Sequence, residues 1–332
     1  MKKNLLKSLA FAAIAALMTA CTQKPAQTQE EPVVLPEDVE IGPYHITALA
    51  ENIYHIQDYN AANPAGESFD ENGEKTHFNN CSDLYLLKGD DAALLIDLSN
   101  FIKWDSTAVE SLRQLVAERI DGKPLTITFT HNHGDHTGMY PAYAGDTTVC
   151  FMLPRIDFEP LLEKLEGSKY ALYDEGLTFD LGGIEINTVM VPGHTHGSMV
   201  FFLKDRDIVF TGDAIGSGHG VWIFNAEGFT EYTQGVPHLI KYIEDPANGI
   251  DKEKLQIYGG HYWQKDWLEL PEGRELGWEY IQDMQTLINQ IYEGTAATEP
   301  SGLNFGALDT YFRLNNSIIV WNKEQAEAIA KK

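Results

Sequence analysis

Hydrophobic positions predict a series of strands and helices from Ile46 onward. Alternating or continuous apolar runs predict strands at 46–58, 83–87, 92–98, 125–130, 147–153, 177–181, 184–191, 199–203, 208–211 and 255–258, and one or two more within 311–321. Apolar residues at helical spacing predict helices at 105–120, 158–165, 236–243 and 277–292. Polar turns such as Gly182-Gly183 join neighbouring strands into hairpins. This order predicts an α/β fold in which two sheets pack together with helices outside them.

The N-terminal segment has a different pattern. Three lysines precede an apolar run at 9–18, which predicts a secretory signal over residues 1–21 and is short for a membrane span. The end of this segment at Cys21 resembles a bacterial lipoprotein cleavage box. We therefore expect an exported protein that is lipid-anchored at Cys21 and lies in the periplasm, at the outer membrane or at the cell surface. An ordinary signal peptide cut near Ala20 is the alternative. Residues 22–43 are polar and Pro-rich, which predicts a flexible tether before a single domain at 44–332.

The net charge of −25 narrows the class of partner. A polyanion repels phosphate backbones, so we expect a small-molecule substrate, no nucleic acid, and membrane contact only through the lipid anchor. Oligomeric state is not predicted. Cys81 and Cys150 lie in strand-like apolar surroundings, which favours buried free thiols, and a disulfide between them is the alternative for an exported protein.

One motif stands directly after the predicted strand 125–130. It is the run His131-Asn132-His133-Gly134-Asp135-His136. A spacing of two in an extended turn directs His131 and His133 to the same side, where both imidazoles can bind one metal ion. Asp135 and His136, one step around the turn, can face a neighbouring ion.

Three further candidate ligands follow other predicted strands, and a glycine precedes each: His194, Asp213 and His261. Glycine lets the backbone approach an ion closely. Asp97 ends the strand that comes before the histidine run. Five imidazoles and two carboxylates suit two Zn²⁺ ions, with iron or manganese as alternatives.

These motifs, in this order over residues 46–262, resemble the metallo-β-lactamase superfamily, and within it the glyoxalase II-like branch with two metals. The resemblance implies a four-layer αββα sandwich with the metals at one edge. It implies that Asp97 supports the metal loop from behind and that Asp135 also holds or moves the catalytic proton. It implies that the first metal is bound by His131, His133 and His194, and the second by Asp135, His136 and His261. Asp213 would bridge the two metals.

The expected function is a metal-dependent hydrolase that uses a metal-bridging hydroxide to cleave a small ester, lactone, thioester or amide. Cleavage of β-lactams is not favoured, because many β-lactamases of the superfamily have Cys or Ser at the position of Asp213. Two alternatives stay open: an enzyme like the mononuclear iron persulfide dioxygenases, and a non-catalytic, metal-containing binding lipoprotein. Candidate substrate contacts lie in loops near the expected metal edge: Tyr59, His196, His219, Trp222 and Tyr262.

Overall fold

The computed structural model describes residues 39–58, 68–69, 75–77, 81–165, 167–218, 220–261, 275–303 and 306–330. The predicted signal segment with Cys21, most of the predicted tether, and the candidate contacts Tyr59, His219 and Tyr262 lie outside these residues. Within the described part of the chain, no helix combines the length and the apolar character needed to cross a membrane.

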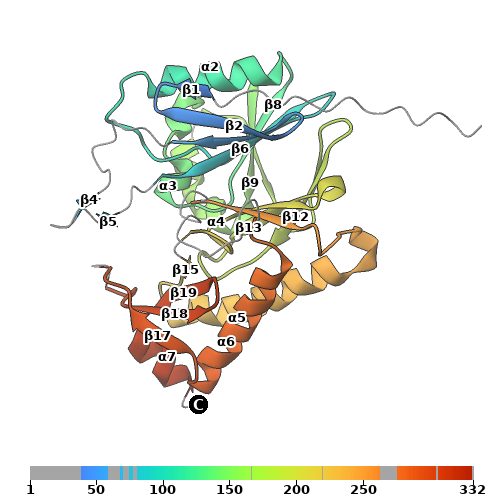
Figure 1. Ribbon diagram of the computed structural model, residues 1–332. Coiled ribbons are helices and arrows are strands. Elements are labelled where there is room, and N and C mark those ends of the chain that lie inside the picture. Colours follow the sequence, from blue (N-terminus) through green and yellow to red (C-terminus); the bar gives the residue numbers. More distant parts are fainter. Residues whose placement is uncertain are drawn as a thin grey trace, which may run out of the picture. The chain divides into compact units, whose positions relative to one another are not determined.

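The histidine run lies in the loop after the sixth of the eight strands of the first sheet, whose strands are drawn in blue and green in Figure 1. Its strands are antiparallel from β1 to β7 and parallel from β7 to β10. In spatial order they are β1 (Val39–Ile41), β2 (Tyr44–Ala50), β3 (Ile53–Gln57), β6 (Asp83–Lys88), β7 (Ala93–Ile96), β8 (Leu125–Thr128), β9 (Val149–Pro154) and β10 (Tyr170–Tyr173).

A second sheet and two smaller ones complete the strands. The second sheet has the order β11 (Thr178–Asp180), β12 (Glu185–Met190), β13 (Met199–Leu203), β14 (Ile208–Gly212) and β16 (Gln256–Gly259). The third has the order β15 (Val221–Trp222), β19 (Ser317–Trp321), β18 (Thr310–Leu314) and β17 (Ala297–Pro300). The short strands β4 (Ser68–Phe69) and β5 (Lys75–His77) pair with each other.

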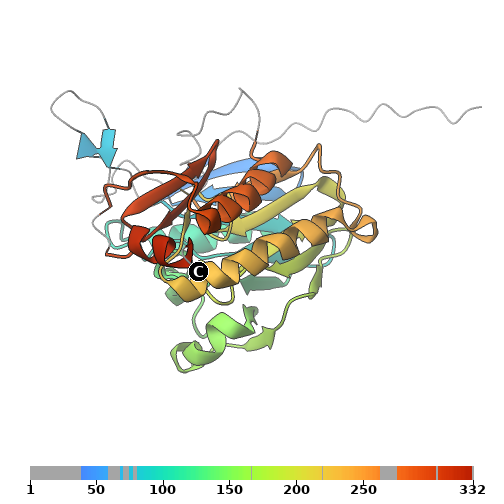
Figure 2. The same cartoon turned by 90° about the horizontal axis from the view of Figure 1, so that it is seen from below.

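The described helices are α2 (Ala108–Ile120), α3 (Gly134–Thr137), α4 (Arg155–Phe158), α5 (Ala226–Glu244), α6 (Trp278–Glu293) and α7 (Lys323–Ala330). The three longest, α2, α5 and α6, cover the outer faces of the two large sheets. Leu112 and Leu115 of α2 share a core with the first sheet, whereas Val236 of α5 and Met284 of α6 share one with the second. Figure 2 shows α5 and α6 crossing the face of the second sheet.

Alternation along the strands makes the central interface between the sheets. In β6, Leu84 and Leu86 belong to the core beneath α2, while Tyr85 and Leu87 belong to a separate core with residues of the second sheet such as Phe201. Successive side chains of a strand point to opposite faces, so every second residue faces each layer. The predicted four-layer αββα sandwich is confirmed.

Two predicted boundaries are wrong. The strand β1 lies inside the residues predicted as tether, because Val39 and Ile41 are partly buried against the core beneath α2 and pair with β2. Helix α5 begins at Ala226, ten residues before the predicted start, with Asn225 as its N-cap accepting from Gly228 N at 2.8 Å. Two glycines in its first half, Gly228 and Gly235, hid the helical pattern.

The glycines of α5 have a packing reason. A Cβ on Gly228 would lie 2.5 Å from the carbonyl oxygen of Gly193, and one on Gly235 would lie 2.9 Å from Cδ of Pro192. The helix therefore passes close to the loop that carries His194. Other differences are small: the predicted strand 46–58 is the hairpin of β2 and β3, the predicted helix 158–165 is α4 followed by a 3₁₀ segment, and β10 was not predicted.

Candidate metal centre

The histidine run lies where β8 leaves the first sheet. After Thr128 the chain continues without regular secondary structure to His133, whose backbone is extended, and α3 then starts at Gly134. The short helix brings Asp135 and His136 back toward the two preceding histidines, and the backbone N–H of His136 donates to the carbonyl of His133 at 3.1 Å. Four candidate ligands thus come from one turn of the first sheet.

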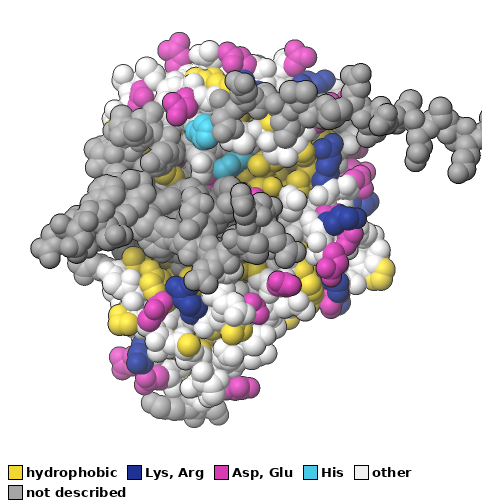
Figure 3. Space-filling view, in the orientation of Figure 1, with side chains coloured by type: hydrophobic (Ala, Val, Ile, Leu, Met, Phe, Trp, Pro, Cys, Tyr) yellow, Lys and Arg dark blue, Asp and Glu magenta, His cyan; other side chains and the backbone are white. Residues whose placement is uncertain are grey.

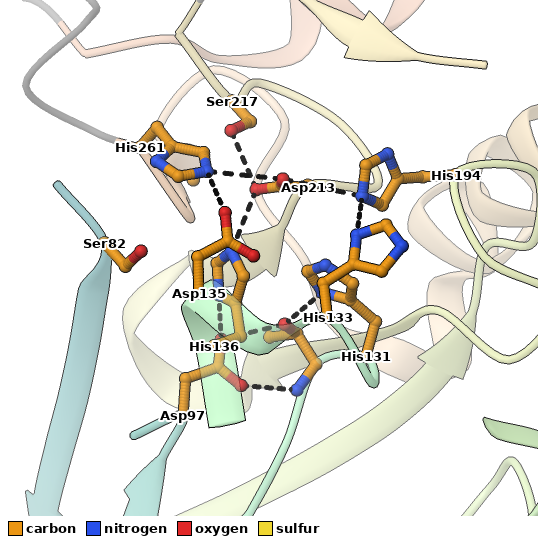
Figure 4. Close-up of polar contacts among 12 residues, drawn as sticks. Ser82, Asp97, His131, His133, Asp135, His136, His194, Asp213, Ser217 and His261 are labelled. Atoms are coloured by element: carbon orange, nitrogen blue, oxygen red, sulfur yellow. Dashed lines mark hydrogen bonds and ion pairs between the residues drawn. The ribbon is translucent and has the colours of Figure 1, made fainter. Parts of the chain in front are cut away.

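The other three candidates come from the second sheet. His194 follows β12, Asp213 follows β14, and His261 follows β16. In Figure 4 all seven side chains point toward one another, with Asp213 between His261 and His194. The centre therefore joins the edges of both sheets, as the sequence analysis expected.

The seven side chains form three overlapping groups in which the ligand atoms lie within 4.8 Å of one another. We call His131, His133 and His194 the first metal group, and Asp135, His136 and His261 the second metal group. Asp213 lies between them: its Oδ2 is 3.5 Å from Nε2 of His194 and 3.4 Å from Nε2 of His261, and its Oδ1 is 3.5 Å from Nε2 of His136. That position suits a bridging ligand.

Second hydrogen bonds fix which nitrogen of each imidazole faces the cluster. Nδ1 of His194 donates to the carbonyl of Trp222 at 2.9 Å, and Nδ1 of His261 donates to the carbonyl of Cys81 at 2.5 Å. Nδ1 of His136 donates to the Asp97 carboxylate at 3.0 Å. Each of these imidazoles therefore turns Nε2 toward the cluster, where a bound cation would use its lone pair.

Asp97 supports both metal groups. It accepts from His136 directly and from the backbone and hydroxyl of Thr130 at 2.7 and 2.8 Å. Because the Thr130 hydroxyl donates to Asp97, it accepts from Nδ1 of His131, 3.0 Å away. Asp97 has φ of 66°, a conformation that is uncommon outside glycine and is often found at functional sites.

The donor set fits a metal ion. Among the described residues, Nε2 of His131 and Nε2 of His136 have no hydrogen-bond partner, although both atoms are buried. A buried polar atom left unpaired costs about 1–3 kcal/mol. Both atoms face the cluster, where a cation would use their lone pairs. The imidazole and carboxylate donors suit Zn²⁺ in particular.

Burial and neighbouring charge shift the histidine pKa values of the two metal groups in opposite directions. Burial lowers the pKa of His131 and of His194, and together with the charge of His194 it lowers the pKa of His133 to about 4. Burial also opposes charge on His136 and His261, but the carboxylates of Asp213 and Asp135 outweigh it and raise both pKa values above the usual range. The first group therefore holds neutral imidazoles, while the second retains protons.

The two carboxylates of the cluster are held ionised. Burial alone would raise the pKa of each, yet positive charge on His136 and His261 lowers the pKa of both Asp135 and Asp213 below the usual range. Their negative charge is the electrostatic attraction for a cation in this cluster.

Two glycines make room for this packing. A Cβ on Gly260 would lie 2.5 Å from Oδ1 of Asp213 and 2.6 Å from Cε1 of His136, so any side chain there would intrude into the second group. Gly212 has φ of 49°, and a Cβ on it would lie 2.4 Å from the Thr130 hydroxyl.

The two described candidate substrate contacts have different surroundings. The Trp222 carbonyl orients His194, and its ring packs on Phe224 with centroids 6.4 Å apart. His196 is largely exposed and pairs with Glu231 of α5 at 2.8 Å, which places it on the surface. Phe224 was not predicted from the sequence, although its ring centroid is 5.6 Å from those of both His133 and His194. Its spacing of two residues from the candidate contact Trp222 could have indicated that both side chains lie on the same side of the chain.

Comparisons with known proteins agree with this geometry. Residues 82–235 match the family model described as the metallo-beta-lactamase superfamily. A metallo-beta-lactamase from Pontibacter korlensis superposes with a TM-score of 0.53 over 74% of this chain and 99% of that chain. The sequence identity of that pair is 14%, so the likeness is one of fold.

Among curated proteins, the chain is similar to proteins named atrochrysone carboxyl ACP thioesterase. The one from Aspergillus fumigatus is 30% identical over 131 residues, which are 38% of this chain and 27% of that protein. The one from Aspergillus chevalieri is 30% identical over 146 residues, which are 43% of this chain and 44% of that protein. The matches thus span less than half of these relatives. The family model covers less than half of this chain, and it agrees with the resemblance to the metallo-β-lactamase superfamily that the motifs indicate.

Proposed function

We propose that the protein hydrolyses small carboxylic thioesters or esters with two divalent metal ions, as in the glyoxalase II-like branch of the superfamily. The observation that carries the proposal is the pair of three-ligand groups with Asp213 between them. We propose Zn²⁺ as the metal, held by the seven residues in the roles predicted from the sequence. The thioesterase names of the curated relatives support a thioester.

Asp97 and Asp135 would have different roles in hydrolysis. Two bound cations would supply Lewis acidity for the scissile carbonyl and lower the pKa of an attacking water. Asp97 orients His136 and, through Thr130, His131 so that Nε2 of each imidazole faces the cluster. The side chain of Asp135 is 24% exposed and its Oδ2 is 3.5 Å from Nε2 of His261. It can therefore accept a proton from water and pass it to the leaving group.

An apolar surface beside the first metal group favours an apolar acyl chain. Phe224 contacts the imidazoles of His133 and His194. It belongs to a partly buried set that packs on Leu308 and on Ile318 and Val320 of the third sheet: Trp222, Phe224, Leu303 and Tyr311. Figure 3 shows hydrophobic side chains at the surface in this part of the molecule. Apolar walls with a few fixed polar groups are typical of small-molecule sites.

Metal content and turnover test the proposal together. We expect two zinc ions per chain by elemental analysis, and hydrolysis of acyl thioesters and p-nitrophenyl esters that stops with chelator and returns with Zn²⁺. His131→Ala should abolish it. His238→Ala is the matched control, because His238 is half-exposed and pairs with Glu175.

Two results would contradict the hydrolase. A chain that binds two zinc ions without turnover on either panel would favour a binding protein. One iron per chain with oxygen consumption on a glutathione persulfide would favour the dioxygenase, which uses only two histidines and one aspartate.

We also propose that the protein is exported and lipid-anchored at Cys21. The support is the basic, apolar and cysteine pattern of residues 1–21. A radiolabelled fatty acid should be incorporated into the wild-type chain in a bacterial host and not into Cys21→Ala. Incorporation into both would refute the anchor.

A further inference from the structure

Two buried aspartates outside the metal cluster bind the loops that carry its ligands. Asp58 is 0% exposed and Asp157 is 4% exposed. We propose that each is a positioning residue for one metal group, Asp58 for the second and Asp157 for the first. The inference rests on the metal sites of the proposed function, and it does not depend on the reaction.

Asp58, at the end of β3, joins two segments that are distant in sequence. Its Oδ1 accepts from the backbone of Ser82 at 2.9 Å. Its Oδ2 accepts from the backbone and the side-chain amide of Asn100 at 3.0 and 2.8 Å. The same amide also donates to the Ser82 hydroxyl at 3.1 Å. One carboxylate thus holds the start of β6 against the loop after β7.

Both of these segments bind ligands of the second metal group. Next to Ser82, the Cys81 carbonyl accepts from His261, and the backbone N–H of Asp83 donates to the carbonyl of Gly260 at 2.9 Å. Next to Asn100, the backbone N–H of Leu98 donates to the carbonyl of His136 at 2.7 Å. Asp58 therefore sets the distance between the supports of His136 and His261.

Asp157, in α4, makes the corresponding contacts around the first metal group. Its Oδ2 accepts from the Thr195 hydroxyl at 2.7 Å, and its Oδ1 accepts from the backbone of Gly197 at 2.8 Å. Thr195 and Gly197 lie one and three residues after His194 in the chain. The Asp157 carbonyl accepts from the side chain of Asn132 at 3.0 Å. Asn132 stands between His131 and His133, so Asp157 ties together the two loops that supply the first group.

Asp97, Asp58 and Asp157 thus have separate roles around the cluster. Asp97 contacts both groups, through His136 and through Thr130. The described contacts of Asp58 lead to His136 and His261, and those of Asp157 lead to the loops of His131, His133 and His194. Partners of metal ligands typically change metal affinity by about 10–100-fold when mutated. We therefore expect the same change, Asp to Asn, to weaken the binding of one metal ion when made at Asp58 and of the other when made at Asp157.

Metal titration of the whole chain tests this without any activity measurement. Asp58→Asn and Asp157→Asn remove a charge at constant size. Each is made in His261→Ala, which should keep only the first group, and in His194→Ala, which should keep only the second. Zn²⁺ affinity is measured against a competing chelator, and Co²⁺ absorption reports the geometry of the remaining ion.

In the His194→Ala protein we expect Asp58→Asn to weaken Zn²⁺ by about 10–100-fold and Asp157→Asn to change it by less than about threefold. In the His261→Ala protein we expect the reverse: Asp157→Asn should weaken Zn²⁺ binding by about 10–100-fold, and Asp58→Asn should change it by less than about threefold. Thermal unfolding of the metal-free variants measures the purely structural cost, which should be similar for both substitutions.

Milder variants keep the test decisive if an aspartate substitution prevents folding. Asn100→Ala removes the amide donor to Asp58, and Thr195→Val removes the hydroxyl donor to Asp157. Equal weakening of both groups by either substitution, or no change in either, would overturn the proposal. Separate effects on metal affinity in a chain without turnover would uphold it while the hydrolase proposal failed.

Discussion

The first metal group consists of three imidazoles, whereas the second joins two imidazoles to a carboxylate. Both groups are largely buried, yet burial lowers the histidine pKa values in the first, and carboxylates raise the histidine pKa values in the second. A metal ion thus meets ready lone pairs in one group and must displace protons in the other. The comparison shows that similar residues at similar depth can form sites with different acid–base behaviour.

The largest effect should come from removing one ligand of each group. His194→Ala and His261→Ala should each lower the metal content from two ions to one. Both should reduce kcat/KM by more than about 100-fold, because a ligand should matter more than its supporting partner. Elemental analysis and steady-state kinetics on the same samples check this. Retention of two ions by either variant would break the distinction between the groups.

An intermediate effect should appear on lowering the pH. Histidines with raised pKa stay protonated to higher pH, so the second group must release protons to bind metal, and its affinity should fall by about tenfold per displaced proton and pH unit. The first group, with lowered pKa values, should bind nearly independently of pH until about pH 4, the pKa of His133. At fixed free Zn²⁺, the content should fall from two to one before it falls further. Simultaneous loss of both ions between pH 8 and 5.5 would contradict this reading.

The smallest effect should be confined to substrate preference beside the first group. Phe224→Ala removes the ring that contacts His133 and His194. We expect about a tenfold loss of kcat/KM for medium-chain acyl thioesters and little loss for acetyl thioesters, since burying a large apolar group contributes about 1.5–3 kcal/mol. Metal content should not change. An equal loss for both chain lengths would mean that Phe224 supports the ligands rather than the acyl group.

The candidate metal ligands could be predicted because each lies in a recognisable local sequence pattern. The run from His131 to His136 follows a clear strand, and His194, Asp213 and His261 each stand after a glycine at a strand end. Parallel and antiparallel pairing then brings those ends to one edge. The structure gathers all seven predicted ligands, and the family's order of motifs supplied their grouping.

The supporting residues were not predictable in the same way. Asp58 binds partners 24 and 42 residues away, and Asp157 binds partners 25 to 40 residues away. A single aspartate near a strand end or in a short helix looks like a solvated turn residue until the packing is known. Phe224 was missed for a similar reason, because its meaning depends on where β15 lies relative to the metal cluster.

The separation of the ligands along the chain has a consequence for assembly. The first sheet supplies the four candidates between His131 and His136, and the second supplies those from His194 to His261. A bound ion is therefore a cross-link that closes long chain loops and spans the core between the two sheets. An unfolded chain offers only the short histidine run, so full metal loading must follow folding. Metal occupancy would then act as a check that both sheets have come together in register.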